Sequence, residues 1–222
     1  MRKLLIIPFA LVILLVVIDR AGLFIAQRAI STRISSTYHL SANPGVSIRG
    51  FPFLTQLVSG HYQQIDVTIS RTTADGVQLQ DIDAKFTGVH ASLSLLLGQD
   101  SGSVTADHAT ATALIPFSQV LLKVPKGIKL SADGTDNLRV TGTTALGVVK
   151  GIATLGVSKK GITVTPEHLS VGGLSAGAIA TRFTFVIPVG VLPLHLTVSG
   201  VHVDSVGLVL AATGQNVEFA SA

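Results

Sequence analysis

A serine motif is the first candidate for chemistry in this sequence. The pentapeptide GLSAG at 173–177 has the G-x-S-x-G spacing of a nucleophile elbow, in which a strained strand-to-helix turn exposes the serine. That mechanism needs an acid and then a histidine further along the chain, yet no histidine follows Asp204 or Glu218. Because glycine is frequent throughout, we interpret the motif as a glycine-rich turn and expect no enzyme. An esterase stays open as the least favoured of three functional hypotheses. Loss of an activity on replacing Ser175 with alanine would support it.

Histidines and carboxylates are the other candidate groups. The seven histidines include no H-E-x-x-H pair and no set of three ligands at metal spacing. Asp81 and Asp83 point the same way from one predicted strand, and Asp66 lies on a neighbouring one. Because catalytic carboxylates would need a cleft and a perturbed acidity, we interpret all three as solvated strand residues. The absence of cysteine removes thiolate chemistry. We therefore expect no catalytic residue, no metal site and no cofactor.

Composition points to lipid or membrane surroundings. The chain has 222 residues, of which 47% are hydrophobic and only 13% charged, about half the usual charged fraction. The net charge of +4 is dispersed, without a basic block interleaved with aromatic residues, so nucleic acid is not an expected partner. A mildly basic surface suits anionic lipid.

The N-terminus has the pattern of an export signal. Arg2 and Lys3 precede an uninterrupted apolar run from Leu4 to Ile18, and no small-x-small cleavage site is evident after it. We predict an uncleaved signal anchor at 1–19, with the rest of the protein on the extracytoplasmic side of the plasma membrane. A cleaved signal peptide stays open as the alternative.

The body is predicted to be one β-rich domain at 20–222 that begins with an amphipathic helix. Leu23, Ile30 and Ile34 recur at helical spacing after the anchor. Beyond Pro44 the period changes to two, as in half-buried antiparallel strands. Such runs occur at 65–69, 82–86, 104–115, 138–142, 148–157, 162–171, 183–187, 194–203 and 207–219. The fold class is therefore α+β, mostly β: a curved antiparallel sheet or elongated half-barrel covered by the N-terminal helix.

The segment GFPFLTQL at 50–57 puts apolar side chains at a turn. Pro52 stiffens the chain, and a short helical turn ending at Gly60 is expected. Its apolar residues either plug the core or contact an apolar ligand, and both roles are compatible in a tube. The predicted lipid-binding residues come from this segment, the first helix and a later apolar segment: Phe51, Pro52, Phe53, Leu54, Leu57, Leu23, Ile30, Ile34, Phe117 and Leu121.

Three lysines punctuate the apolar segment FSQVLLKVPKGIKL at 117–130. Lys123, Lys126 and Lys129 fit an amphipathic lip that rests on anionic head groups, each contributing about 1 kcal/mol. A solvated loop is the equally weighted alternative.

These segments together resemble the LmeA-like family of actinobacterial cell-envelope lipid-binding proteins. The resemblance rests on DRAGLFIAQRAIST, on VSIRGFPFLTQLVSGHYQQIDVTIS, on LQDIDAKFTGVH and on VLPLHLTVSGVHVDSVGLVLAATG. It implies a fold akin to the tubular lipid-binding (TULIP-like) proteins and an envelope or periplasmic location. It also implies binding of phospholipids such as phosphoinositides. For the member that gives the family its name, it implies support of mannan elongation in lipomannan.

The resulting hypothesis is a membrane-anchored protein that binds or shuttles phospholipid in support of envelope glycolipid assembly, with the biosynthetic enzymes as further partners. The runner-up is a non-enzymatic scaffold for an envelope glycosyltransferase, without a lipid cavity.

Overall fold

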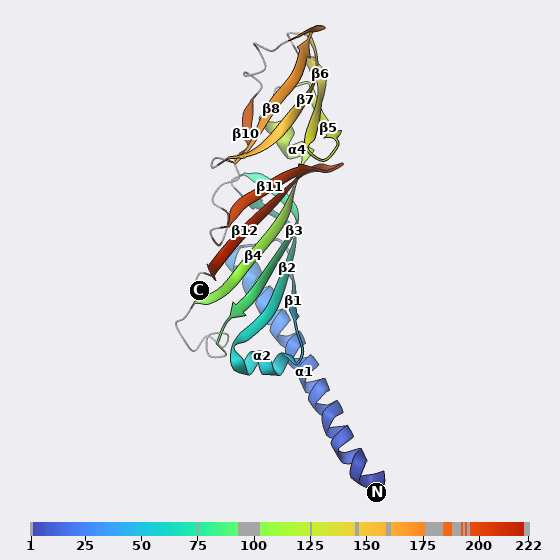
Figure 1. Cartoon of the computed structure of the whole chain (residues 1–222), viewed down its shortest axis with the longest axis vertical. Coiled ribbons are helices and arrows are strands. Elements are labelled where there is room, and N and C mark those ends of the chain that lie inside the picture. The colour runs from blue at the N-terminus through green and yellow to red at the C-terminus, as the bar shows by residue number, and fades with distance from the viewer. Residues whose placement is uncertain are drawn as a thin grey trace. The chain divides into compact units, whose positions relative to one another are not determined.

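The computed structural model describes most of the chain. The described residues are 2–74, 76–92, 103–124, 126–144, 147–158, 161–175, 184–187, 192, 194 and 196–219. Within them the elements are α1 (Arg2–Thr37), β1 (Gly45–Arg49), α2 (Phe53–Ser59), β2 (His61–Ala74), β3 (Val77–His90), β4 (Val104–Pro116), α4 (Phe117–Val120), η1 (Leu121–Lys123), β5 (Ile128–Asp133), β6 (Asn137–Thr144), β7 (Gly147–Ser158), β8 (Gly161–Val171), β9 (Leu174–Ser175), β10 (Phe185–Ile187), β11 (Thr197–Val203) and β12 (Gly207–Phe219) (Figure 1).

The strands form two open antiparallel sheets, so the predicted fold class is confirmed. One sheet has the order β1-β2-β3-β4-β12-β11, and the other has the order β10-β8-β7-β6-β5 with β9 paired to β8. Gly76 lies between β2 and β3, and a turn at 134–136 joins β5 to β6; Gly76 and Gly134 both have positive φ. β5 begins inside the 117–130 segment interpreted above as a lip or loop and overlaps it at residues 128–130, so Lys129 is part of a strand.

The chain divides into two compact units. Unit 1 comprises Met1–Ile69, Ala84–Ala109 and Gln215–Ala222, and unit 2 comprises Ser70–Asp83 and Thr110–Gly214. Each unit is thus assembled from segments that are distant in the sequence.

Unit 1 shows the two-residue period clearly where β1 pairs with β2. Val46 lies opposite Val67 and Ile48 opposite Ile65, while the alternate pairs place Arg49 opposite Gln64. One face of this ribbon is therefore apolar and the other polar. Phe86 of β3 and Phe219 of β12 add an edge-to-face ring pair with centroids 5.0 Å apart.

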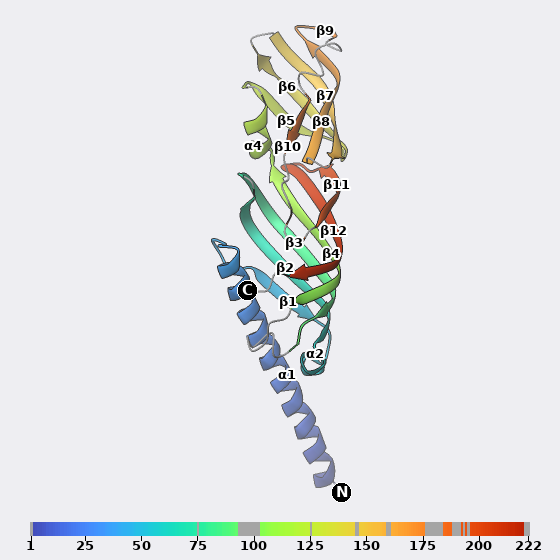
Figure 2. The same ribbon diagram turned by 90° about the vertical axis from the view of Figure 1, so that its left-hand side faces the viewer.

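Helix α1 is continuous across the boundary predicted at residue 19. Its C-terminal half packs on β1 and α2 through half-buried pairs that recur every four residues: 22/23, 26/27, 30/31 and 34/35 (Figure 2). Leu23, Ile30 and Ile34 lie on this face, as the helical spacing predicts. Ser31 Oγ donates a hydrogen bond to the Pro44 carbonyl at 2.6 Å and fastens the helix where the chain enters β1.

Unit 2 has an apolar core. Leu138, Ile162, Leu208 and Val120 are each 0% exposed and belong to one cluster contributed by β6, β8, β12 and α4. Strand β11 contacts both β6 and β7.

Candidate functional site

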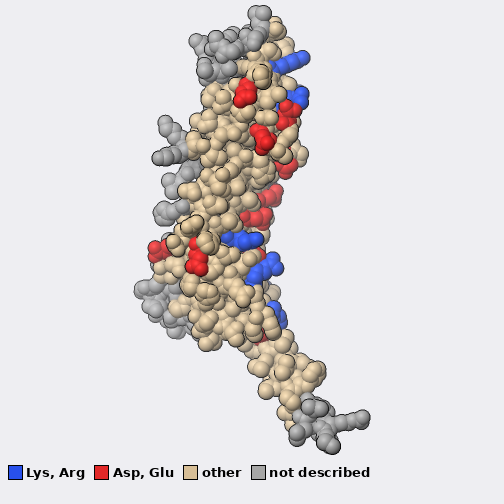
Figure 3. Space-filling view, viewed as in Figure 1, with Lys and Arg blue, Asp and Glu red and all other residues tan. Residues whose placement is uncertain are grey.

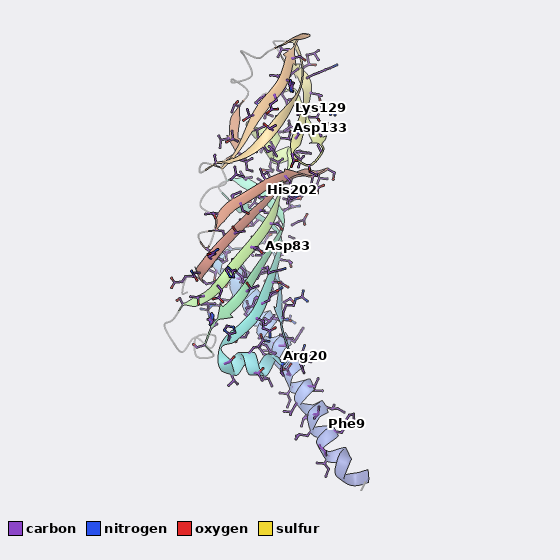
Figure 4. All side chains as sticks on the ribbon, viewed as in Figure 1. Phe9, Arg20, Asp83, Lys129, Asp133 and His202 are labelled. Atoms are coloured by element: carbon purple, nitrogen blue, oxygen red, sulfur yellow. The ribbon has the colours of Figure 1, made fainter. Side chains whose placement is uncertain are left out.

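The apolar N-terminal part of α1, from Ile7 to Ile18, is not covered by other described parts of the protein. From Ile7 to Ile18 every residue is exposed, and Figure 3 shows this projecting part without acidic or basic side chains. Phe9, labelled in Figure 4, is 68% exposed. Ile7–Thr37 is long and apolar enough to cross a membrane, with a mean hydropathy of 2.4 and 6% of the most apolar window buried.

The first acidic residue of α1 fastens helix α2 to it. Asp19 is 3% exposed, and its Oδ1 accepts a hydrogen bond from the backbone N–H of Leu54 at 2.8 Å. Pro52, which precedes α2, supplies no side-chain cap, so the Asp19 carboxylate satisfies one of the free N–H groups of the first turn. Asp19 is therefore a tertiary cap that joins two helices.

Arg20 completes this junction. Its guanidinium donates to Asp19 Oδ2 at 2.7 Å and lies over the Phe51 ring, 5.0 Å from the centroid. Figure 4 marks the position of Arg20 on α1, next to α2. Both charges at the end of the apolar run are thus engaged by the GFPFLTQL segment.

That segment forms the short helix the sequence predicts, with Gly60 closing it at φ 67°. Its apolar residues divide between two environments. Phe53 is 1% exposed and, with Leu54, lies against Gly22 of α1, whereas Phe51 is 62% exposed. Pro52 is also exposed, and Leu54 and Leu57 are half-buried. The two phenylalanines therefore have different roles: one plugs the core and one faces outward.

Two buried donors lie beside the plug, and the apolar pattern does not reveal them. Gln56 Oε1 accepts the Gln63 N–H at 3.0 Å, which leaves its Nε2 group without an acceptor among the described residues. The Tyr62 hydroxyl, on a ring that is 2% exposed and 6.4 Å from the Phe53 ring, likewise has none there. Burial raises the pKa of Tyr62, which keeps it a neutral donor. Both residues lie in the segment VSIRGFPFLTQLVSGHYQQIDVTIS. The polar residues within this apolar stretch are the sequence signal that could have pointed to them.

Unpaired buried donors ordinarily cost about 1–3 kcal/mol each, so they suggest a ligand that supplies acceptors. Phosphate, ester and carbonyl oxygens are acceptors of this kind.

The exposed face of α1 carries a shallow depression that is wide open to solvent, and every described residue that lines it comes from this one helix. The described residues that line it have the apolar pair nearest the projecting half and two arginines further along: Phe24, Ile25, Arg28, Ala29, Thr32, Arg33 and Ser36. An amphiphile with an apolar tail and an anionic head matches this order.

The remaining predicted residues lie in unit 2. Phe117 packs against the unit 2 core and Leu121 is half-buried in η1. Lys126 and Lys129 are exposed, and Lys123 is in η1. Of the predicted lipid-binding residues, those of α1 and α2 thus lie together in unit 1, whereas Phe117 and Leu121 lie in unit 2.

The other sequence motifs take ordinary positions. Ser175 ends the two-residue strand β9, opposite Ser170 of β8, after a turn at Gly172 and Gly173, while Ala176 and Gly177 lie outside the described residues. Within the described part of the chain, no three His, Asp or Glu side chains form a metal-binding group.

Comparison with family models decides the identity of the chain. The LmeA-like phospholipid-binding model matches residues 17–213. The chain belongs to the LmeA-like phospholipid-binding family. Searches of curated proteins and of solved structures return no match. The matched range includes Asp19, Arg20, α2 and the depression on α1, and it leaves out most of the projecting apolar half of α1. Membership in this family supports phospholipid binding. The family is a lipid-binding family, not an enzyme family.

Proposed function

We propose that this protein is anchored by α1 in the plasma membrane, faces the extracytoplasmic side, and binds or shuttles phospholipid in support of cell-envelope glycolipid assembly. The observation that carries the lipid-binding part is the family match over residues 17–213. The exposed apolar residues from Ile7 to Ile18 support the anchor.

The described side chains offer complementary contacts for such a ligand. Phe24 and Ile25 suit acyl chains, and Arg28 and Arg33 suit phosphate. The Tyr62 hydroxyl does not line this depression and is a separate, buried donor in unit 1 that suits an ester or phosphate oxygen. Transfer of an acyl chain out of water is worth about 0.8 kcal/mol per methylene, on the order of 10 kcal/mol in total. An exposed Arg–phosphate contact contributes roughly 1 kcal/mol or less. Acyl burial would therefore dominate affinity, and the polar contacts would select the head group. Because the described lining of the depression comes from α1 alone, burial of a whole acyl chain needs surface beyond that lining.

The test is native mass spectrometry of the full chain purified in detergent, with identification of any retained lipid. We expect one phospholipid per chain, and we expect the double variant Arg28→Gln/Arg33→Gln to shift the retained head groups away from anionic ones. The matched control is Arg71→Gln, an exposed arginine on β2. A wild-type chain that retains no lipid and takes none up from vesicles would contradict the proposal and favour the scaffold hypothesis.

A further inference from the structure

The uninterrupted apolar run Leu4–Ile18 is shorter than the hydrocarbon core of a bilayer, so a membrane span formed by α1 has to include residues beyond Ile18. From Leu4 to Ile18 a helix rises about 22 Å at 1.5 Å per residue. The hydrocarbon core of a bilayer is about 30 Å thick. A short span is accommodated when the flanking residues of the protein are drawn towards the bilayer. The residues that follow Ile18 therefore lie at the membrane boundary.

Those following residues continue the apolar surface after a short interruption. Phe24 and Ile25 are 62% and 66% exposed. The interruption consists of Asp19 and Arg20, and the Asp19 carboxylate is sheltered by the Leu54 N–H and the Arg20 guanidinium. The Asp19 charge is thus turned towards α2, away from lipid, while the Arg20 side chain stays about half exposed.

Helix α2 is fixed at the same level, because Asp19 caps it and Gly22 contacts Phe53. Residues 50–60 contain no charged side chain. On the outward side Val58 is 83% exposed and Phe51 is 62% exposed.

The hydroxyl groups on this side are already satisfied locally. Thr55 Oγ1 donates to the Pro52 carbonyl at 2.8 Å, and Ser59 Oγ donates to the Gln56 carbonyl at 3.1 Å. Moving these groups out of water therefore costs less than moving free hydroxyls.

We propose that α2 and Phe51 form a docking surface that seats unit 1 in the head-group and acyl boundary of the bilayer that α1 crosses. The occupant is the lipid surface itself. Phe51 and Val58 enter the acyl boundary, and Arg20, stacked on Phe51, lies at the level of the phosphates. This inference rests on the proposed anchoring of α1.

Tryptophan quenching tests the inference cleanly, because the chain has no tryptophan. Full-length single-tryptophan variants are reconstituted in phosphatidylcholine–phosphatidylglycerol vesicles with and without brominated acyl chains. The variants are Val58→Trp and Phe51→Trp on the docking surface, Leu14→Trp in the apolar run, and Tyr38→Trp as the control. Tyr38 follows the end of α1, roughly 28 Å from Asp19 at helical rise, and is 48% exposed.

We expect brominated lipid to remove most of the emission at positions 14, 51 and 58 and little at position 38. Quenching at position 14 without quenching at 51 and 58 would overturn the docking surface and leave the anchor intact. Absence of quenching at position 14 would overturn the anchor, and the docking inference with it.

Discussion

The hydroxyl of Tyr62 is buried without an acceptor in the described part of unit 1. We expect Tyr62→Phe to leave the free energy of unfolding unchanged or to raise it by up to about 1 kcal/mol, because an unpaired polar group is removed. The same variant should retain less phospholipid. Urea unfolding and lipid quantification by mass spectrometry measure the two effects. Tyr38→Phe, at the other tyrosine of the chain, is the control. Unchanged lipid content in Tyr62→Phe would show that the hydroxyl has no ligand role.

Asp66 gives a stability contribution that depends on pH. Burial opposes its ionisation, but hydrogen bonds from Arg49 and Gln64 outweigh burial and hold the pKa of this carboxyl below its usual value. The contribution is therefore complete above the unfolded pKa of about 4 and is lost as pH falls through the lower folded pKa. Because Arg49 is 62% exposed, it amounts to less than about 1 kcal/mol.

Unfolding free energies of the wild type and Asp66→Asn, measured from neutral to acid pH, check this. The difference between them should shrink at acid pH, and Arg49→Met should add little to Asp66→Asn. A difference that stays constant with pH would contradict the expectation.

At the scale of elements, the contact between α1 and α2 depends on the Asp19 carboxylate. We expect Asp19→Ala to lower the free energy of unfolding by about 1–2 kcal/mol, because the Leu54 N–H loses its acceptor. Asp19→Asn keeps an oxygen acceptor and should cost less. Thermal unfolding in detergent and hydrogen exchange of the α2 amides measure both variants. Equal losses in the two would indicate that the charge matters and the hydrogen bond does not.

The sequence predicts the elements well and their partners poorly. Alternation reports that one face of a strand is buried, so it locates β2, β3 and β4, yet the same signal does not name the neighbouring strand. An acid directly after an apolar run is typical of a helix flank, and its hydrogen bond to Leu54, 35 residues away, has no local signature. Likewise, apolar residues in GFPFLTQL predict burial, and the contrast between buried Phe53 and exposed Phe51 depends on how α2 packs on α1.

At the scale of the whole molecule, the projecting half of α1 is separable from the folded body. We expect a purified chain that lacks residues 2–18, mixed with phospholipid vesicles, to stay in the supernatant after an alkaline wash and sedimentation, whereas the full chain sediments, because the deleted residues supply the apolar exposed surface. Its circular dichroism should keep the β signal of the full chain, since Asp19 and α2 remain. A shortened chain that resists the wash, or that loses its β signal, would contradict this expectation.

The sheet orders also bear on how the protein comes into being. Strand β4 neighbours β12, and Phe86 meets Phe219, so unit 1 needs residues from both extremes of the sequence. During synthesis α1, β1 and α2 leave the ribosome first, and unit 1 cannot be completed until β12 has also left it. Throughout that interval β4 has an open hydrogen-bonding edge, which leaves nascent chains of this protein open to edge-to-edge pairing with one another.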